Sequence, residues 1–252
     1  MKSGKPMSSA MLPLPSSASA APRRRKSDLA DLDARRQLVS AMQQLDSQGL
    51  NRGSTGNASV RAAAGGFWIT PTGMMAADLS IEGLVWVDAR NEAHGPWMPS
   101  SEWHFHCAIY QQRPDLQAVL HTHSVHATAL ACLRRALPPF HYMVAVAGGC
   151  DVPCTPYHLF GTEALSQSVA LAFEDRQACL MANHGLVAAG RDMAQAQKVL
   201  QEIEALCGIY LQALAIGEPV RLSREEMAEV IERFKTYGQA ARHKPAQPAA
   251  GL

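Results

Sequence analysis

The chain has 252 residues, of which 47% are hydrophobic and 18% are charged, and its formal net charge is +1. So small a charge excludes a broad basic surface for nucleic acid or an anionic membrane, and no apolar run reaches the length that spans a bilayer. The six cysteines are scattered without a CxxC pair, which is typical of reduced thiols. We therefore expect a cytoplasmic globular protein that has neither nucleic acid nor a membrane as a partner.

The two ends of the sequence differ in composition from the rest. Residues 1–28 are rich in Ser, Pro and Ala and carry the basic run RRRK at residues 23–26. This run could be a targeting or nucleic-acid patch, but a disordered, solvated tail explains it more simply. Residues 239–252 predict a flexible C-terminal tail, so residues 29–238 form one predicted domain.

The first half of this domain mixes helical spacing with short β-type runs. A helix is predicted between an Asp/Ser start and a Gly stop, and a glycine-rich segment with strand-like runs follows it. In chain order, the predicted elements are a helix over residues 27–49, strands over residues 67–70 and 84–88, and a helix that follows Ser101, has Glu102 in its first turn and ends before Pro114.

The second half alternates the same two kinds of element. Ser124, Thr162 and Ser223 precede helical spacing as N-caps, and Glu226 stands at capping-box spacing from Ser223. This alternation predicts an α/β protein with helices covering a central sheet. The predicted elements are a strand (116–123), a helix (124–137), a strand (140–149), a helix (161–175), a strand pair around a turn (178–190) and two helices (192–217 and 223–238).

Three histidines stand close together at the end of one predicted strand. His121 and His123 are two residues apart, so in a strand their side chains share a face and can reach one ion. Two histidines satisfied within the core would explain this pair equally well. A tetrahedral catalytic zinc site needs three protein ligands, and His184, at a strand end before a glycine, is the best third one. His126 falls in the first turn of the next helix, where we expect it to support the site.

The other histidines lack such spacing. His104 and His106 lie inside a predicted helix, where side chains two residues apart diverge, and we assign both to the surface or to packing. The remaining histidines, which carry no metal-ligand spacing, are His94, His141, His158 and His243.

Three polar turns could hold an anion. Each combines backbone N–H groups with short hydroxyl or amide side chains, and the last also opens a helix, where the dipole favours negative charge. Each could equally be an ordinary turn or cap. Glu102 follows the third turn, and it is either a carboxylate that complements the helix dipole or a general base. The predicted phosphate-binding residues are Gly56, Asn57, Thr72, Gly73, Ser100 and Ser101.

Taken in order, these segments resemble the class II aldolase/adducin family, and most of all its aldolases of the L-fuculose 1-phosphate type. The resemblance covers residues 29–238 and implies a three-layer α/β/α fold around a central, largely antiparallel sheet. The motifs that carry it are TGNASVR, ITPTG, PSSEWHFHCAIYQQRPD, VLHTHSVHATA, HYMVAVAGG, VPCTPYHLFGT, NHGL and RFKTYG.

The resemblance also implies a zinc-dependent lyase. Such a protein cleaves a ketose 1-phosphate into dihydroxyacetone phosphate and an aldehyde such as lactaldehyde, through a zinc-stabilised enediolate. One Zn²⁺ per chain and a homotetramer with active sites between subunits are expected. A sugar-phosphate 4-epimerase or a decarboxylase on the same scaffold is an alternative. A non-catalytic, adducin-like binding module is another, although that branch has no need of an intact metal triad and base.

Individual roles are carried over from the matching motifs. His121, His123 and His184 match the zinc ligands, and Glu102 matches the catalytic acid/base, which can also ligate zinc. Tyr142 resembles the tyrosine that protonates or steers the aldehyde oxygen, and the six turn residues match the phosphate-binding positions. The residues matched to the aldehyde side, some of them expected from a neighbouring subunit, are Phe160, Phe234 and Tyr237, the last also matched as catalytic.

Overall fold

One mixed sheet of eight strands forms the centre of the molecule. The computed structural model describes residues 21–235, so Tyr237 and most of the two predicted tails lie outside the described residues. The strand order is β4-β3-β2-β1-β5-β8-β7-β6, and neighbouring strands are antiparallel except β6 and β7, which are parallel. The strands are β1 (Asn57–Arg61), β2 (Phe67–Ile69), β3 (Val85–Val87), β4 (Ala93–His94), β5 (Ala118–Thr122), β6 (Cys154–Thr155), β7 (Ala178–Met181) and β8 (Gly185–Gly190).

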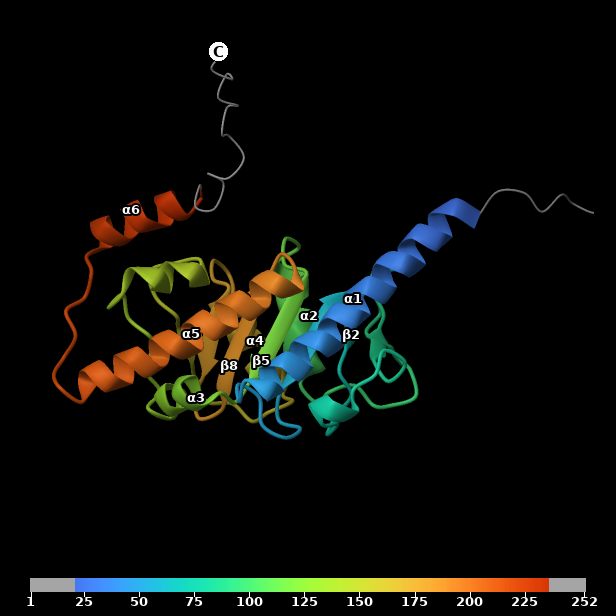
Figure 1. Ribbon diagram of the computed structural model, residues 1–252, viewed down its shortest axis with the longest axis horizontal. Helices are drawn as coiled ribbons and strands as arrows, with labels where there is room; N and C mark the ends of the chain where they lie inside the picture. The colour runs from blue at the N-terminus through green and yellow to red at the C-terminus, as the bar shows by residue number, and fades with distance from the viewer. Residues whose placement is uncertain (1–20, 236–252) are drawn as a thin grey trace, which may run out of the picture.

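Helices cover both faces of this sheet, with α1, α3 and α5 on the near face and α2 and α4 behind it (Figure 1). The predicted α/β fold with a largely antiparallel central sheet is confirmed. Within the described residues, no helix has both the length and the apolarity that crossing a membrane requires. The helices are α1 (Ala21–Ser47), α2 (Trp103–Gln112), α3 (Val125–Cys132), α4 (Glu163–Ala172), α5 (Met193–Leu214), α6 (Arg224–Phe234) and two 3-10 helices, η1 (Ala76–Asp78) and η2 (Tyr142–Ala147).

Strand β5 separates the two cores of the protein. Ala118 and Leu120 pack into the core under α1, α3 and α5, whereas Val119 packs into the core under α2 and α4. This alternation follows from the two-residue period of a strand. By the same period His121 faces the α2 side, where it is fully buried and meets Phe105 edge to face at 5.8 Å.

Two predicted elements differ from the structure. Residues 140–149 were expected as a strand, but they contain the 3-10 helix η2, in which the His141 side chain accepts a hydrogen bond from Met143 N at 3.2 Å. The apolar run is buried by packing against α5 and α6 rather than by strand pairing, and periodicity cannot separate these cases in so short a run. Helix α1 begins at Ala21, before the predicted start at residue 27 and inside the predicted tail, because Ala and Arg favour helix and Pro is tolerated in a first turn.

Candidate metal and active site

His121, His123 and His184 converge, as the sequence predicted. His121 lies in β5 between Asn57 of β1 and Val187 of β8, His123 follows the strand, and His184 lies in the turn from β7 to β8. The Nε2 atoms of His121 and His123 are 3.1 Å apart, and each pair of the three rings has its centroids 4.8 to 4.9 Å apart. The three ring nitrogens therefore point toward a common centre.

Two glycines make this convergence possible. A Cβ at Gly185 would lie 2.5 Å from the Thr122 carbonyl oxygen and 3.0 to 3.1 Å from the rings of His123 and His121. A Cβ at Gly56 would lie 2.7 Å from the His121 carbonyl oxygen. Gly56, a predicted phosphate-binding residue, therefore allows the chain to pack closely against strand β5, which carries His121.

Glu102 completes the cluster from the N-cap position of α2, one residue before the first turn in which it was expected. Its Oε2 atom lies 3.3 Å from His121 Nε2, and its Oε1 atom lies 3.1 Å from His184 Nε2. His121 Nδ1 donates to the Leu186 carbonyl oxygen at 3.0 Å, which leaves a lone pair on Nε2 directed into the cluster.

These donors fit a tetrahedral divalent cation. Three imidazole nitrogens and a carboxylate oxygen are typical zinc ligands, and bonds of about 2.0–2.1 Å imply donor separations of about 3.3–3.4 Å. Three separations in the cluster are close to this range, at 3.1 Å between His121 and His123, 3.3 Å from His121 to Glu102 Oε2 and 3.1 Å from His184 to Glu102 Oε1, and the ligand nitrogens of the three histidines all lie within 4.8 Å of one another. Glu102 Oε1 is buried without a hydrogen-bond partner among the described residues, so a cation would satisfy an otherwise costly oxygen.

The surroundings set the protonation states that metal binding requires. Burial lowers the pKa of His121 to about 3 and also lowers the pKa of His123. For Glu102, burial acts to raise the pKa, but His121, His184 and the Asn57 amide outweigh it, and the pKa falls to about 2. At neutral pH the site therefore presents the neutral imidazoles of His121 and His123 and the ionised carboxylate of Glu102.

Asn57, predicted as a phosphate ligand, has its side chain bound to Glu102. Its Nδ2 donates to Glu102 Oε2 at 2.8 Å, and its Oδ1 accepts from His106 Nε2 at 2.6 Å. His106, which the sequence assigns to the surface or to packing, is fully buried, and its link to the site was missed. One sequence signal could have revealed this link. His106 is a polar residue on the buried face of an amphipathic helix, between the core positions Phe105 and Ile109.

The three predicted anion-binding turns lie next to one another. The Asn57–Glu102 hydrogen bond joins the first turn to the third, and a bridge between Pro71 and Pro99 joins the second turn to the third. Ser100 is buried, and its hydroxyl accepts from Glu102 N at 3.3 Å. The predicted phosphate residues that are exposed are Thr72, Gly73 and Ser101.

A pocket of about 290 Å³ opens over the cluster. Glu102, His123 and His184 form its floor, and Ser101 and the predicted Phe160 also line it. Much of the remaining wall comes from the loop between β6 and α4, within the motif VPCTPYHLFGT, whose individual contacts no spacing rule predicts. The lining residues that the sequence reasoning missed are Thr55, Tyr157, His158 and Asn183.

Tyr142 and Phe234 do not line this pocket. Tyr142 lies half-exposed on η2, which packs against α5 and α6, and Phe234 ends α6. In Figure 1, α6 runs along the upper edge, whereas α3, which begins just after His123, lies at the lower edge. Within one chain, the two predicted aromatic residues are therefore separate from the histidines.

His126 contacts α5 rather than the metal cluster. Its Nδ1 lies 2.9 Å from Glu204 Oε1, and the Glu204 carboxylate also accepts from the backbone N–H groups of His126 and Ala127, each at 2.8 Å. Ser124 is the N-cap residue as predicted, but its hydroxyl donates to Glu204 at 2.7 Å instead of accepting from the helix. His126 thus joins α3 to α5, and its support of the site stays a prediction.

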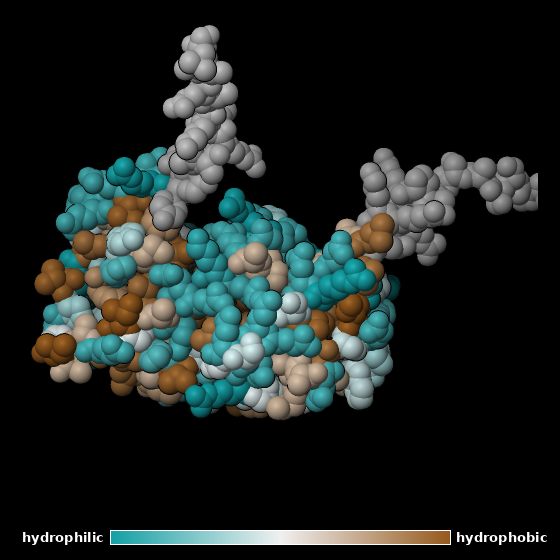
Figure 2. Space-filling model, viewed as in Figure 1, coloured by the Kyte–Doolittle hydropathy of each residue, from teal (hydrophilic) through white to brown (hydrophobic). Residues whose placement is uncertain are grey.

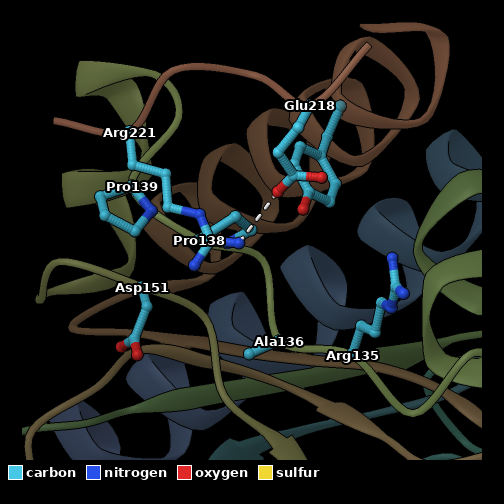
Figure 3. A pocket seen from close by; sticks show the side chains of 8 residues that line it. Arg135, Ala136, Pro138, Pro139, Asp151, Glu218 and Arg221 are labelled. Atoms are coloured by element: carbon cyan, nitrogen blue, oxygen red, sulfur yellow. Dashed lines mark hydrogen bonds and ion pairs between the residues drawn. The ribbon is translucent and has the colours of Figure 1, made fainter. Parts of the chain in front are cut away.

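Other groups in the described part of the chain are less suited to chemistry. A cavity of about 500 Å³ lies by the segment before η2 and the connection from α5 to α6, where Arg221 pairs with Glu218 at 3.0 Å (Figure 3). A second cluster of potential metal ligands joins a turn and strand β4, but two of its three members are exposed. Its members are Asp88, Glu92 and His94.

Three histidines and one carboxylate that could hold a metal ion thus lie together on a layered α/β fold. Residues 36–211 match the family model described as Class II Aldolase and Adducin N-terminal domain, and the chain belongs to this family. It is accordingly a class II aldolase, a lyase, as predicted.

Named relatives agree with this assignment. The 5-methylthioribulose-1-phosphate/5-deoxyribulose-1-phosphate aldolase of Rhodospirillum rubrum is 48% identical, over 84% of this chain and 95% of its own. The L-fuculose phosphate aldolase of Escherichia coli K12 is 46% identical, over 81% of this chain and 94% of its own. A solved structure of an L-fuculose 1-phosphate aldolase superposes with a TM-score of 0.78 at 38% identity, covering 81% of this chain and 96% of that one.

Proposed function

We propose that this class II aldolase holds one Zn²⁺ per chain and cleaves a ketose 1-phosphate into dihydroxyacetone phosphate and an aldehyde. The observation that carries the proposal is the convergence of His121, His123, His184 and buried Glu102, of which His123, His184 and Glu102 line one pocket. These four residues would hold the cation. When bound, it would supply a Lewis acid for the negative charge that develops on substrate oxygen.

Glu102 is the proposed acid/base. In the synthetic direction its carboxylate takes a proton from C3 of dihydroxyacetone phosphate, and in cleavage it returns a proton to C3 after the C3–C4 bond breaks. The lowered pKa of Glu102 keeps it ionised and able to accept that proton. Tyr142 is the proposed acid toward the aldehyde oxygen, because a phenol hydroxyl can donate a proton to that oxygen.

The polar turns and the aromatic wall suggest how the two halves of the substrate bind. Thr72, Gly73 and Ser101 offer hydroxyl and backbone N–H groups to the phosphate, which would fix the reacting carbons over the histidines. Tyr157 and Phe160 offer an apolar surface to the aldehyde. We propose a substrate of the L-fuculose 1-phosphate type, whose aldehyde ends in a methyl group; 5-deoxy and 5-methylthio pentulose phosphates differ from it only in the aldehyde half.

The complete active site is proposed to form between subunits of a homotetramer. Tyr142 and Phe234 lie apart from the histidines of their own chain, so a neighbouring chain would have to supply them. The connection between α5 and α6 exposes Ile216 and Val220 by 95% and 90%, and Figure 2 shows apolar residues at this end of the molecule. Exposed apolar groups of this kind favour an interface with another chain. The six free cysteines suit a reducing cytoplasm, where we propose that the enzyme acts.

An aldol assay tests the proposal. Dihydroxyacetone phosphate is incubated with lactaldehyde, acetaldehyde or (methylthio)acetaldehyde, before and after chelation and after adding back Zn²⁺, Mn²⁺ or Co²⁺. We expect a ketose 1-phosphate product that disappears on chelation and returns with Zn²⁺. Epimerisation of a pentulose phosphate, or carbon dioxide release from an acidic substrate without an aldol product, would contradict the proposal, as would a protein that neither binds metal nor turns over.

A further inference from the structure

A buried chain of hydrogen bonds leads away from Glu102 into the core. Glu102 is joined to Asn57 at 2.8 Å, Asn57 to His106 at 2.6 Å, His106 to Ser59 at 2.7 Å, and Ser59 to Tyr110 at 2.9 Å. All five side chains are buried. Asn57 and Ser59 are two residues apart on β1, and His106 and Tyr110 are four residues apart on α2, so each pair shares the face on which strand and helix meet.

The direction of each hydrogen bond follows from the carboxylate end. A carboxylate oxygen accepts, so the Asn57 amide must present its Nδ2 to Glu102 and its Oδ1 to His106. His106 must then carry its proton on Nε2, which leaves Nδ1 to accept from the Ser59 hydroxyl. The Tyr110 hydroxyl, which can donate either to Ser59 at 2.9 Å or to the Gln117 carbonyl oxygen at 3.4 Å, ends the chain.

The ring of His106 has only one N–H group to donate. Burial lowers the pKa of His106 to about 3, so the ring is neutral and only one of its two nitrogens is a donor. The Ser59 hydroxyl, within 2.7 Å of Nδ1, can donate to that nitrogen, which matches the accepting role that the Asn57 contact leaves to Nδ1. Ring orientation is also restricted, because Phe105 stacks on His106 with centroids 4.6 Å apart.

We propose that His106 is a positioning residue that fixes the orientation of the Asn57 amide, so that the NH₂ group of Asn57, and not its carbonyl oxygen, faces Glu102 and the pocket floor. A flipped amide would set Oδ1 against the Glu102 carboxylate, and two acceptors would then face each other in a buried site. The amide NH₂ therefore holds Glu102 in place beside the histidines. The same group would still offer a donor to a substrate oxygen that displaced the carboxylate.

This inference rests on the proposed function only for the role of Glu102. The position of the proton on His106 can be measured without any assay of turnover. Neutron diffraction from crystals of the whole protein should place a deuteron on His106 Nε2 and none on Nδ1. A deuteron on Nδ1 would overturn the inference, even if the enzyme proves to be an aldolase.

Kinetic comparison tests the consequence for catalysis. His106→Leu removes the donor, whereas His106→Gln keeps an N–H donor near the position of Nε2. For His106→Leu we expect the kcat of C3 proton exchange on dihydroxyacetone phosphate to fall by about 10- to 100-fold, with bound zinc and KM nearly unchanged. His106→Gln should lose much less. Ile109→Ala, equally buried on α2 but without a polar contact, controls for general loosening of the helix.

A double-mutant cycle separates positioning from a merely structural role. Because His106 acts through Asn57, adding His106→Leu to Asn57→Leu should cause little further loss of kcat. Additive losses would overturn the inference, and so would full activity in His106→Leu. If His106→Leu fails to fold, His106→Gln and Ser59→Ala each replace it in the cycle with Asn57→Leu. Additive losses in these cycles, or a deuteron on His106 Nδ1, would then overturn the inference. Absence of exchange in the wild-type protein would instead count against the proposed function.

Discussion

Glu102 meets three partners at once, and each places a different demand on it. Its two oxygens lie 3.3 Å from His121 and 3.1 Å from His184, while Asn57 donates to it at 2.8 Å. The histidine contacts suit a metal ligand, and the Asn57 contact suits a base that must keep its orientation. Both uses require the ionised carboxylate that the lowered pKa provides.

Replacing Glu102 by Gln separates these uses. We expect Glu102→Gln to abolish C3 proton exchange on dihydroxyacetone phosphate, because an amide cannot accept the proton. The protein should still bind about one Zn²⁺ per chain, because three histidine ligands remain. Exchange is followed by proton NMR in D₂O, and zinc is measured by atomic emission after dialysis. Normal exchange in this variant would rule out the base role.

His106 should make the metal-free protein sensitive to acid. Its pKa, ordinarily near 6.5, is lowered to about 3 in the folded state by burial. As the pH falls below 6.5, the unfolded chain binds this proton first, so the free energy of unfolding falls with pH down to about 3 and is fully retained above 6.5.

His106→Gln removes this titration. Between pH 6 and pH 4, the slope of the free energy of unfolding against pH should be smaller in the variant than in the wild-type protein. The difference in slope should reach at most about 1.4 kcal/mol per pH unit. Urea titrations at several pH values measure the slope. His104→Gln, an exposed histidine on the same helix, is the matched control, and an equal change in both variants would contradict the prediction.

At the scale of elements, the N-terminal end of α3 is capped by a side chain of another helix, α5. Glu204 of α5 accepts hydrogen bonds from two N–H groups of the first turn and from the Ser124 hydroxyl. Glu204→Gln loses the charge that these donors face and sets an NH₂ group against one of them. We expect the variant to lose about 1–3 kcal/mol of stability in urea unfolding. Glu202→Gln, two residues earlier on α5, should change stability by less than about 0.5 kcal/mol; equal losses would show that the cap is unimportant.

The same cap marks the limit of what the sequence could predict about elements. Helical spacing and the residue Ser124 were enough to predict where α3 begins. The residue that satisfies its N-terminal N–H groups stands 80 positions from Ser124, and no local pattern reports it. The sequence predicts a strand where the 3-10 helix η2 lies, because its apolar pattern does not show that α5 and α6 bury it.

The candidate site was predictable in the same uneven way. The strand period indicated that His121 and His123 share a face, the strand end before a glycine indicated His184, and the family motifs added the roles of His184 and Glu102. The motifs did not reveal that Asn57 is held between Glu102 and His106, because these contacts join β1 to α2 between residues 45 and 49 positions apart in the sequence. The distant position of Tyr142 likewise needs the three-dimensional fold.

At the scale of the whole molecule, a site shared between chains can be tested by complementation. His123→Ala should inactivate the metal site, and Tyr142→Phe should strongly reduce turnover. If Tyr142 serves a neighbouring chain, an equal mixture refolded together should regain activity at about a quarter of the sites, through pairs that combine the two intact halves.

Two further measurements make this result decisive. A mixture of His123→Ala with His184→Ala should regain nothing, because both changes damage the same half of the site. Mass spectrometry of the mixed assemblies establishes that the chains have exchanged. Exchange without recovery would place Tyr142 in the site of its own chain or outside the reaction.

The position of the histidine cluster in the sheet also bears on how such an enzyme can diverge. His121, Asn57 and the turn that carries His184 belong to β5, β1 and the start of β8, at the middle of the sheet, where most substitutions would disturb the core. Tyr157 and Phe160 lie half or more exposed on a surface loop, where change costs little stability. Under the proposed function, substitutions in this loop would change the aldehyde that the enzyme accepts while the residues around the histidines, and the reaction they support, stay the same. The two relatives of almost equal identity, named for different sugars, are what such substitutions would leave behind.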